Sequence, residues 1–207
     1  ITAFSFFPTK NMTTAEGGAV ASINPDLLLR AKRFSRQGLI RNPEEFIIKS
    51  EGSWHQEVHE FGLNYRLPDV LCALGISQLT RLEESKSKKL DIFHEYSSEF
   101  GNHENLILPT TRPDIVPNWH LYPLRVPMNQ RRQIIEEMTA HGIRAQVNYI
   151  PAYWHPVFQD RAFKKDQYLN SYNFYQSEIS IPMFSSLTKN EISFVINTVV
   201  EIVNRIV

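Results

Sequence analysis

The chain has 207 residues with 22 basic and 22 acidic side chains, so its formal net charge is zero, and nothing in this balance indicates a nucleic-acid or membrane surface. Its length allows one large domain or two small ones with a sizeable core. The single cysteine, Cys72, excludes a disulfide framework within the chain and favours a reducing, cytoplasmic location.

The first predicted element is a strand over residues 2–7, which enters a turn at Pro8. Gly17 and Gly18 indicate a second turn, and residues 19–21 predict another short strand. This arrangement would hold Lys10 on a loop that is fixed from both sides. On residue type alone, a solvated surface amine is the commoner role for such a lysine.

A helix is predicted next, with Asn24 as its cap and Pro25 at its first position. Its last turn is basic. We expect Arg33 and Arg36 to interact with the helix dipole and solvent, with a substrate-phosphate role as the less favoured alternative.

Residues 39–61 predict an irregular, polar surface excursion near a binding site. His55, Glu57 and His59 could suggest a metal site. A solvated loop is the favoured interpretation, because no second group of ligands accompanies them.

Apolar residues recur at helical spacing from Val70 to Phe100, after Pro68 in a position suited to a first helical turn. One long helix, or a kinked pair, would therefore connect two domains. We assign residues 1–66 to the remainder of a large domain, 67–100 to the connecting helix and 101–207 to a small α/β domain.

The small domain is predicted from alternating strand and helix patterns and a capping box at residues 188–191. Its expected strands cover residues 119–126, 143–150 and 179–182, and its expected helices cover residues 131–140 and the C-terminal segment.

Several motifs together resemble one known family. They are Ser5-Phe6-x-Pro8-x-Lys10, Thr13-Thr14-x-Glu16-Gly17-Gly18-Ala19-Val20, Gly62-x-Asn64-Tyr65-Arg66-x-x-Asp69, Trp119-His120-Leu121-Tyr122, Gln146-Val147-x-Tyr149-Ile150-Pro151 and Ser180-x-Pro182. They resemble the DegT/DnrJ/EryC1/StrS family of pyridoxal 5'-phosphate (PLP) dependent nucleotide-sugar aminotransferases. The resemblance implies an α/β, PLP-dependent transferase of fold type I, here with part of the large domain and the small domain.

In that family the lysine that matches Lys10 forms the Schiff base with the cofactor. The serine that matches Ser5 contacts the cofactor phosphate. The asparagine that matches Asn64 reaches the phosphate in the neighbouring subunit, which implies a homodimer with shared active sites. The alternative is that Asn64 only holds the turn before the helix through an Asx-type bond.

The closest branch of the family acts on UDP-linked 4-keto-6-deoxy-N-acetylhexosamines and makes the amino-altrosamine precursor of pseudaminic acid. The resemblance implies amination at C4 with an amino-acid donor, glutamate in most relatives. We expect Tyr149, Tyr153 and His155 to bind the substrate, with domain packing as the alternative role of these aromatics. Two positions depart from the branch pattern, since Tyr153 and Phe7 stand where relatives carry histidine.

Two other functions are compatible with parts of this sequence. Related PLP sugar dehydratases carry histidine in place of the lysine, and Lys10 argues against them. A non-catalytic fragment that only dimerises or supports the fold is the alternative of another class. We expect the chain to be part of a longer protein, because residues 1–9 contain no acid to pair with the cofactor's ring nitrogen.

Overall fold

The computed structural model describes residues 1–161, 164 and 166–207. The chain divides into two compact units, Ile1–Leu82 (unit 1) and Glu83–Val207 (unit 2). The division lies inside the 67–100 segment that the sequence assigns to the connecting helix. No helix in the described part is both long and apolar enough to cross a membrane.

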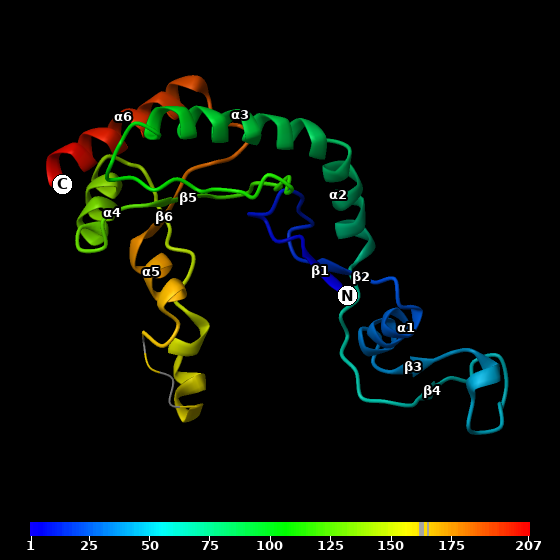
Figure 1. Cartoon of the computed structure of the whole chain (residues 1–207). Helices are drawn as coiled ribbons and strands as arrows, with labels where there is room; N and C mark the ends of the chain where they lie inside the picture. The colour runs from blue at the N-terminus through cyan, green and yellow to red at the C-terminus, as the bar shows by residue number, and fades with distance from the viewer. Residues whose placement is uncertain (162–163, 165) are drawn as a thin grey trace. The chain divides into compact units, whose positions relative to one another are not determined.

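Unit 1 begins with an antiparallel pair of strands, β1 (Thr2–Ser5) and β2 (Gly18–Ala21), shown in dark blue in Figure 1. Ser5 lies opposite Gly18, and every residue of both strands is exposed. Helix α1 (Pro25–Phe34) follows, and the side chain of Asn24 caps it by accepting from two backbone amides. The predicted cap and helix are thus confirmed.

Residues 39–61 are more ordered than a simple loop. They contain the two-residue strands β3 (Leu39–Ile40) and β4 (Glu57–Val58), paired antiparallel, and the 3-10 helix η1 (Pro43–Glu45) between them. Ile40 and Glu57 are directly opposite each other and are both buried. The short β3–β4 hairpin therefore joins the two ends of the polar segment between residues 41 and 56.

The connecting segment forms two helices, α2 (Asp69–Leu79) and α3 (Leu82–Phe100), which is the kinked-pair alternative. Thr80 caps the C-terminus of α2, and its backbone amide donates to the carbonyls of Ile76 and Gln78. Glu84 and Lys88 form an ion pair on the exposed side of α3, at 2.7 Å.

Unit 2 is built on two antiparallel strands, β5 (Tyr122–Arg125) and β6 (Glu178–Ile181), with α3, α4 (Arg131–Ala140) and α6 (Lys189–Ile206) contributing to the same core (Figure 1). The largest fully buried side chains in this core are Tyr96, Tyr122 and Phe100. The predicted capping box of α6 is present, with Thr188 and Glu191 satisfying each other's backbone amides.

The prediction of a strand over residues 143–150 is wrong. Residues 143–150 form no named strand, and only Gln146 makes a bridge, to Ser180 of β6. The ladder stops there because the backbone amide of Asn148 donates to the side chain of Glu178. Three further elements were not predicted: α5 (Leu169–Ser177) and the 3-10 helices η2 (Ala152–Trp154) and η3 (Pro156–Arg161).

Candidate active site

Backbone hydrogen bonds hold Lys10 in a tight turn between β1 and β2. The amide of Lys10 donates to the carbonyl of Phe7 at 2.9 Å. The carbonyl of Phe6 accepts from the amide of Thr14 at 2.9 Å and from the hydroxyl of Thr13 at 3.0 Å. Lys10 is half-buried. The structure thus places Lys10 on a loop that is fixed at both ends, as the sequence predicts.

Helix α2 supports this turn through the close approach of Gly75 to Thr14. The Thr14 side chain is 1% exposed, and its hydroxyl donates to the carbonyl of Glu16 at 2.8 Å. A Cβ on Gly75 would lie 2.9 Å from the methyl group of Thr14. Only glycine fits there without displacing the turn, so the helix and the lysine loop are packed as one body within unit 1.

Ser5 lies at the end of β1 and is exposed, with its hydroxyl 3.4 Å from the amide of Phe7, which is a weak contact. Asn64 lies on the segment that returns to α1. Hydrogen bonds of Leu63 to Phe34 and of Tyr65 to Ser35 fix the backbone on both sides of it. Both predicted phosphate ligands therefore present polar groups at the surface of unit 1.

The Asx-type bond that was the alternative role for Asn64 is not found. Its side chain is exposed and makes no hydrogen bond to the residues that the structure describes. Helix α2 begins after Pro68 without any side-chain cap. The fixed backbone and unbonded amide leave this side chain available to a group outside unit 1.

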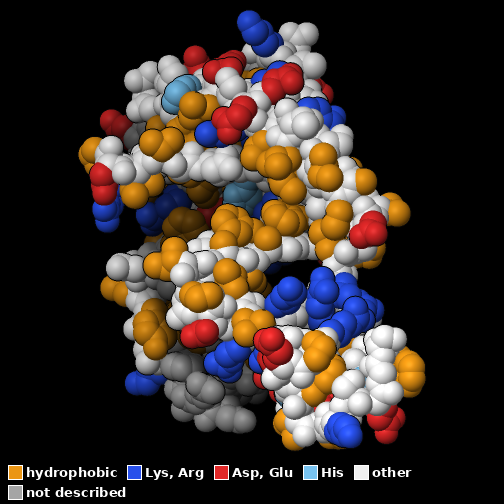
Figure 2. Space-filling model, turned by 90° about the vertical axis from the view of Figure 1, so that its right-hand side faces the viewer, with side chains coloured by type: hydrophobic (Ala, Val, Ile, Leu, Met, Phe, Trp, Pro, Cys, Tyr) orange, Lys and Arg blue, Asp and Glu red, His pale blue; other side chains and the backbone are white. Residues whose placement is uncertain are grey.

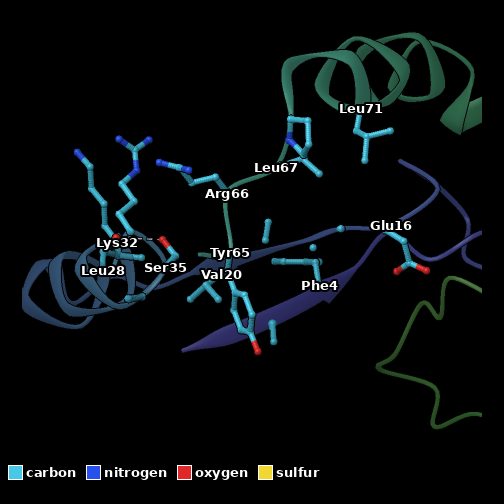
Figure 3. Close-up of a pocket in the computed structure, with 17 residues that line it drawn as sticks. Phe4, Glu16, Val20, Leu28, Lys32, Ser35, Tyr65, Arg66, Leu67 and Leu71 are labelled. Carbon is cyan, nitrogen blue, oxygen red and sulfur yellow. Dashed lines mark hydrogen bonds between the residues drawn. The ribbon is translucent and has the colours of Figure 1, made fainter. Parts of the chain in front are cut away.

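A hollow of about 1060 Å³ lies beside the β1–β2 pair, although Ser5, Lys10 and Asn64 do not line it. Figure 3 shows its wall: Phe4 and Val20 from the strands, Lys32 from α1, and Tyr65 and Arg66 from the returning segment. The side chains of Lys32 and Arg66 extend on the same side of this wall (Figure 3).

A second hollow in unit 1, of about 310 Å³, is strongly basic. We call it the cationic hollow and define it by Lys32, Arg33, Arg36, Arg41 and Arg66. Glu45 is the one acid in its lining, and it is ion-paired with Arg33. In Figure 2, Lys and Arg side chains gather beside hydrophobic ones on the face shown. Such a concentration of positive charge favours an anion with several oxygens.

The loop next to this hollow is organised around the buried carboxylate of Glu57. Its oxygens accept from the amides of Ile47 and Ile48 at 2.8 and 2.7 Å, and from the imidazoles of His55 and His59 at 3.2 and 2.5 Å. Burial alone would raise the pKa of Glu57, but the hydrogen bonds from His59, the two amides and His55 outweigh it and lower the pKa to about 2.

The side chains that could have suggested a metal site are hydrogen-bonded to one another, His55 and His59 each to Glu57. In residues 1–161, 164 and 166–207, no group of three or more His, Cys, Asp or Glu side chains is arranged to hold a metal ion. His55 also packs its ring against Phe46 at 4.7 Å between centroids. The contacts of Glu57 and His55 therefore connect and order residues 46–59.

Acid should loosen this loop through Glu57. Because its pKa is lower in the folded state than the ordinary 4.5, the ionised carboxylate stabilises the loop above that pH, and the stabilisation is lost as the pH falls toward 2. We expect the hydrogen-exchange protection of residues 46–58, corrected for intrinsic rates, to fall about 10-fold between about pH 5 and about pH 2.5. In Glu57→Gln it should already be low at the higher pH and vary little. Glu44→Gln, at an exposed acid of the same segment, is the control and should behave as wild type; equal behaviour of the two variants would contradict the assignment.

In unit 2, the three predicted substrate residues lie on or beside η2. Tyr149 and His155 are exposed, whereas Tyr153 is half-buried and packs its ring against Trp154 and Tyr168, at 6.4 and 5.0 Å between centroids. Packing is therefore part of the role of Tyr153. Tyr149, with 72% of its surface exposed, is open to a ligand.

Solved sugar aminotransferases share this fold. PseC of Helicobacter pylori, an aminotransferase involved in pseudaminic acid biosynthesis, aligns with a TM-score of 0.86 and 26% identity over 98% of this chain and 53% of that one. The PLP-form of Spr1654 of Streptococcus pneumoniae, a candidate sugar aminotransferase, aligns with a TM-score of 0.85 and 26% identity over 100% of this chain and 52% of that one. The predicted fold class, an α/β PLP-dependent transferase of fold type I, is confirmed.

The family can also be stated. Residues 1–200 match the DegT/DnrJ/EryC1/StrS aminotransferase family, and the chain belongs to it. The UDP-4-amino-4,6-dideoxy-N-acetyl-beta-L-altrosamine transaminase of Campylobacter jejuni is 31% identical over 98% of this chain and 52% of its own length. The spore coat polysaccharide biosynthesis protein SpsC of Bacillus subtilis is 31% identical over 98% of this chain and 53% of its own length. The chain spans about half the length of these curated relatives.

The residues present fit the family's cofactor by their chemistry. Lys10 offers a primary amine on a rigid turn, and the exposed hydroxyl of Ser5 and amide of Asn64 are groups that bind phosphate oxygens. PLP as the family's cofactor agrees with the PLP-form of Spr1654.

Two features, one in each unit, were missed from the sequence. The cationic hollow combines Arg66 with α1 and β3, and only the folded chain shows that they meet. The buried carboxylate of Glu178 in β6 was missed as well, although a charged residue in an otherwise apolar strand was a usable signal.

Proposed function

We propose that the protein transfers an amino group to a nucleotide-linked keto-sugar, with PLP as cofactor. The substrate we favour is a UDP-4-keto-6-deoxy-N-acetylhexosamine, aminated at C4 with glutamate as donor. The observation that carries the proposal is the rigid turn that holds Lys10 in a chain of this family. The substrate choice is supported by relatives that are named as UDP-amino-altrosamine transaminases and are 31% identical.

Lys10 would hold the cofactor, and Ser5 and the Asn64 of a second copy would bind its phosphate. When bound, the cofactor supplies an electron sink for the carbon that loses a proton. The amine at Nζ of Lys10 would accept that proton as a general base and return it as a general acid. The hydrogen bonds that fix the turn hold the backbone from which the Lys10 side chain extends.

The cationic hollow would bind the diphosphate of the nucleotide sugar. Four of its five basic residues are arginines, whose planar groups match phosphate oxygens in pairs. Glu45 neutralises Arg33 only, so the hollow keeps an excess of positive charge. A diphosphate would balance that excess, which supports a nucleotide-linked sugar over a free one.

The test is a panel of nucleotide-linked keto-sugars given to the intact protein with PLP and glutamate, with products identified by mass. We expect an amino-sugar product from the UDP-linked 4-keto-6-deoxy substrate and 2-oxoglutarate in equal amount. A free keto-sugar without the nucleotide is the matched control and should react poorly. If no keto-sugar of the panel is aminated, the proposal is wrong.

Tyr153 should affect the sugar more than the amino donor. We expect Tyr153→Ala to raise the KM for the sugar about 10-fold and to leave the KM for glutamate within about twofold, because the lost ring lies on the proposed sugar loop. Tyr153→Phe keeps the ring and separates the role of the hydroxyl. Should both KM values rise together, or only the thermal stability fall, the contacts with Trp154 and Tyr168 explain the residue as packing.

A further inference from the structure

Glu178 is a fully buried carboxylate at the start of β6. One of its oxygens accepts from the backbone amide of Asn148 at 2.8 Å, and the other accepts from the hydroxyl of Ser180 at 2.6 Å. It thus connects the strand at the centre of unit 2 to residues 146–155, which we call the aromatic loop.

The aromatic loop has few other backbone hydrogen bonds to the core, and its C-terminal part packs the ring of Trp154 against Tyr172 and Tyr175 of α5. Gln146 exchanges two backbone hydrogen bonds with Ser180, at 3.0 and 2.7 Å. Among the described residues, the next backbone hydrogen bond of the loop is internal, from Trp154 to Pro151. Between these points, at Asn148, the loop is tied to β6 by the Glu178 side chain. Tyr149 follows directly and is exposed.

Burial of the Glu178 carboxylate costs desolvation free energy, and its hydrogen-bond partners indicate what offsets that cost. Burial raises the pKa of Glu178, while Ser180, the amide of Asn148 and the charge of Arg131 act in the opposite direction. An apolar side chain would cost less to bury, but it would leave the amide of Asn148 without an acceptor. A carboxylate at position 178 therefore contributes more to holding the loop, through the amide of Asn148, than to packing of the core.

We infer that Glu178 is a positioning residue, which sets the conformation of the aromatic loop and through it the sugar site. The second part of this inference rests on the proposed function. Glu178 acts through the amide of Asn148 on Tyr149 and η2.

Hydrogen exchange tests the anchor without any need for activity. Glu178→Leu should speed exchange of the amides of the aromatic loop about 10-fold, because it removes the acceptor of Asn148, and should leave β5 and α6 unchanged. Glu178→Gln keeps one acceptor oxygen and should stay within about threefold of wild type. Ser177→Ala is the matched control, since that neighbouring buried hydroxyl bonds Arg125 and α5 but not the loop.

If Glu178→Leu does not fold, Ser180→Ala replaces it, with a smaller acceleration expected at the same amides. Wild-type exchange in the loop, or equal acceleration in β5 and α6, would overturn the anchor.

Kinetics test the link to the sugar. Glu178→Leu should raise the KM for the keto-sugar about 10-fold with kcat and the KM for glutamate nearly unchanged, and Glu178→Gln should restore most of the loss. If kcat and both KM values change together while exchange is altered only in the loop, the link to the sugar is wrong. If wild type aminates no sugar of the panel, the proposed function fails, and the exchange result still decides whether Glu178 sets the loop.

Discussion

Lys10→Arg should reduce transamination by the intact protein at least about 1000-fold, because a guanidinium stays protonated and can neither link to the cofactor nor accept a proton. The charge and much of the length are kept, so the turn should survive. The backbone hydrogen bonds of the turn and those of the Thr13 and Thr14 hydroxyls do not involve the amine. The loss would therefore report chemistry at Nζ.

Two measurements separate this result from unfolding. Lys49→Arg, at an exposed lysine of the same unit, is the control and should keep activity within about twofold. Borohydride reduction of the wild-type protein with PLP should fix the cofactor to the peptide that contains Lys10, and the Arg variant should take up no label there. Label on another lysine would show that the assignment is wrong.

The elements whose signals are local could be predicted from the sequence. Asn24 before Pro25 and the Thr188–Glu191 box mark helix starts through bonds within one turn, and both helices begin where expected. The failed strand at 143–150 depended on a contact that is distant in sequence, since Glu178 takes the amide of Asn148 out of the ladder. A pattern of apolar residues gives no sign of such a competing acceptor.

The candidate site also has features with local sequence signals and features that depend on contacts distant in sequence. Lys10 and Ser5 belong to one short motif, and the turn that presents Lys10 is closed by neighbours in sequence, so the motif was enough to predict a rigid turn around Lys10. The cationic hollow gathers Arg66 with residues of α1 and β3. Its positive charge is a sum over side chains that the tertiary fold brings together, which no local pattern contains.

The second prediction with a large expected effect is the recovery of activity when two different variant chains are mixed. We expect an inactive Lys10→Ala chain mixed with a weakened Asn64→Ala chain to recover about one quarter of wild-type activity, if the active unit is a two-fold dimer in which Asn64 serves the partner's cofactor. Random exchange makes half of the dimers hybrid, and each hybrid keeps one site with both residues intact.

Asn64 is suited to this test because its side chain is exposed and makes no hydrogen bond within the described residues, so its removal should not weaken the fold. The backbone around it is held through Leu63 and Tyr65, which the substitution leaves in place. A mixture of Lys10→Ala with Lys10→Arg is the control, since both chains lack the same residue and no hybrid site can be complete. Absence of recovery in the Lys10→Ala and Asn64→Ala mixture, with subunit exchange shown by mass, would place Asn64 and Lys10 in the same chain's site or remove Asn64 from the site altogether.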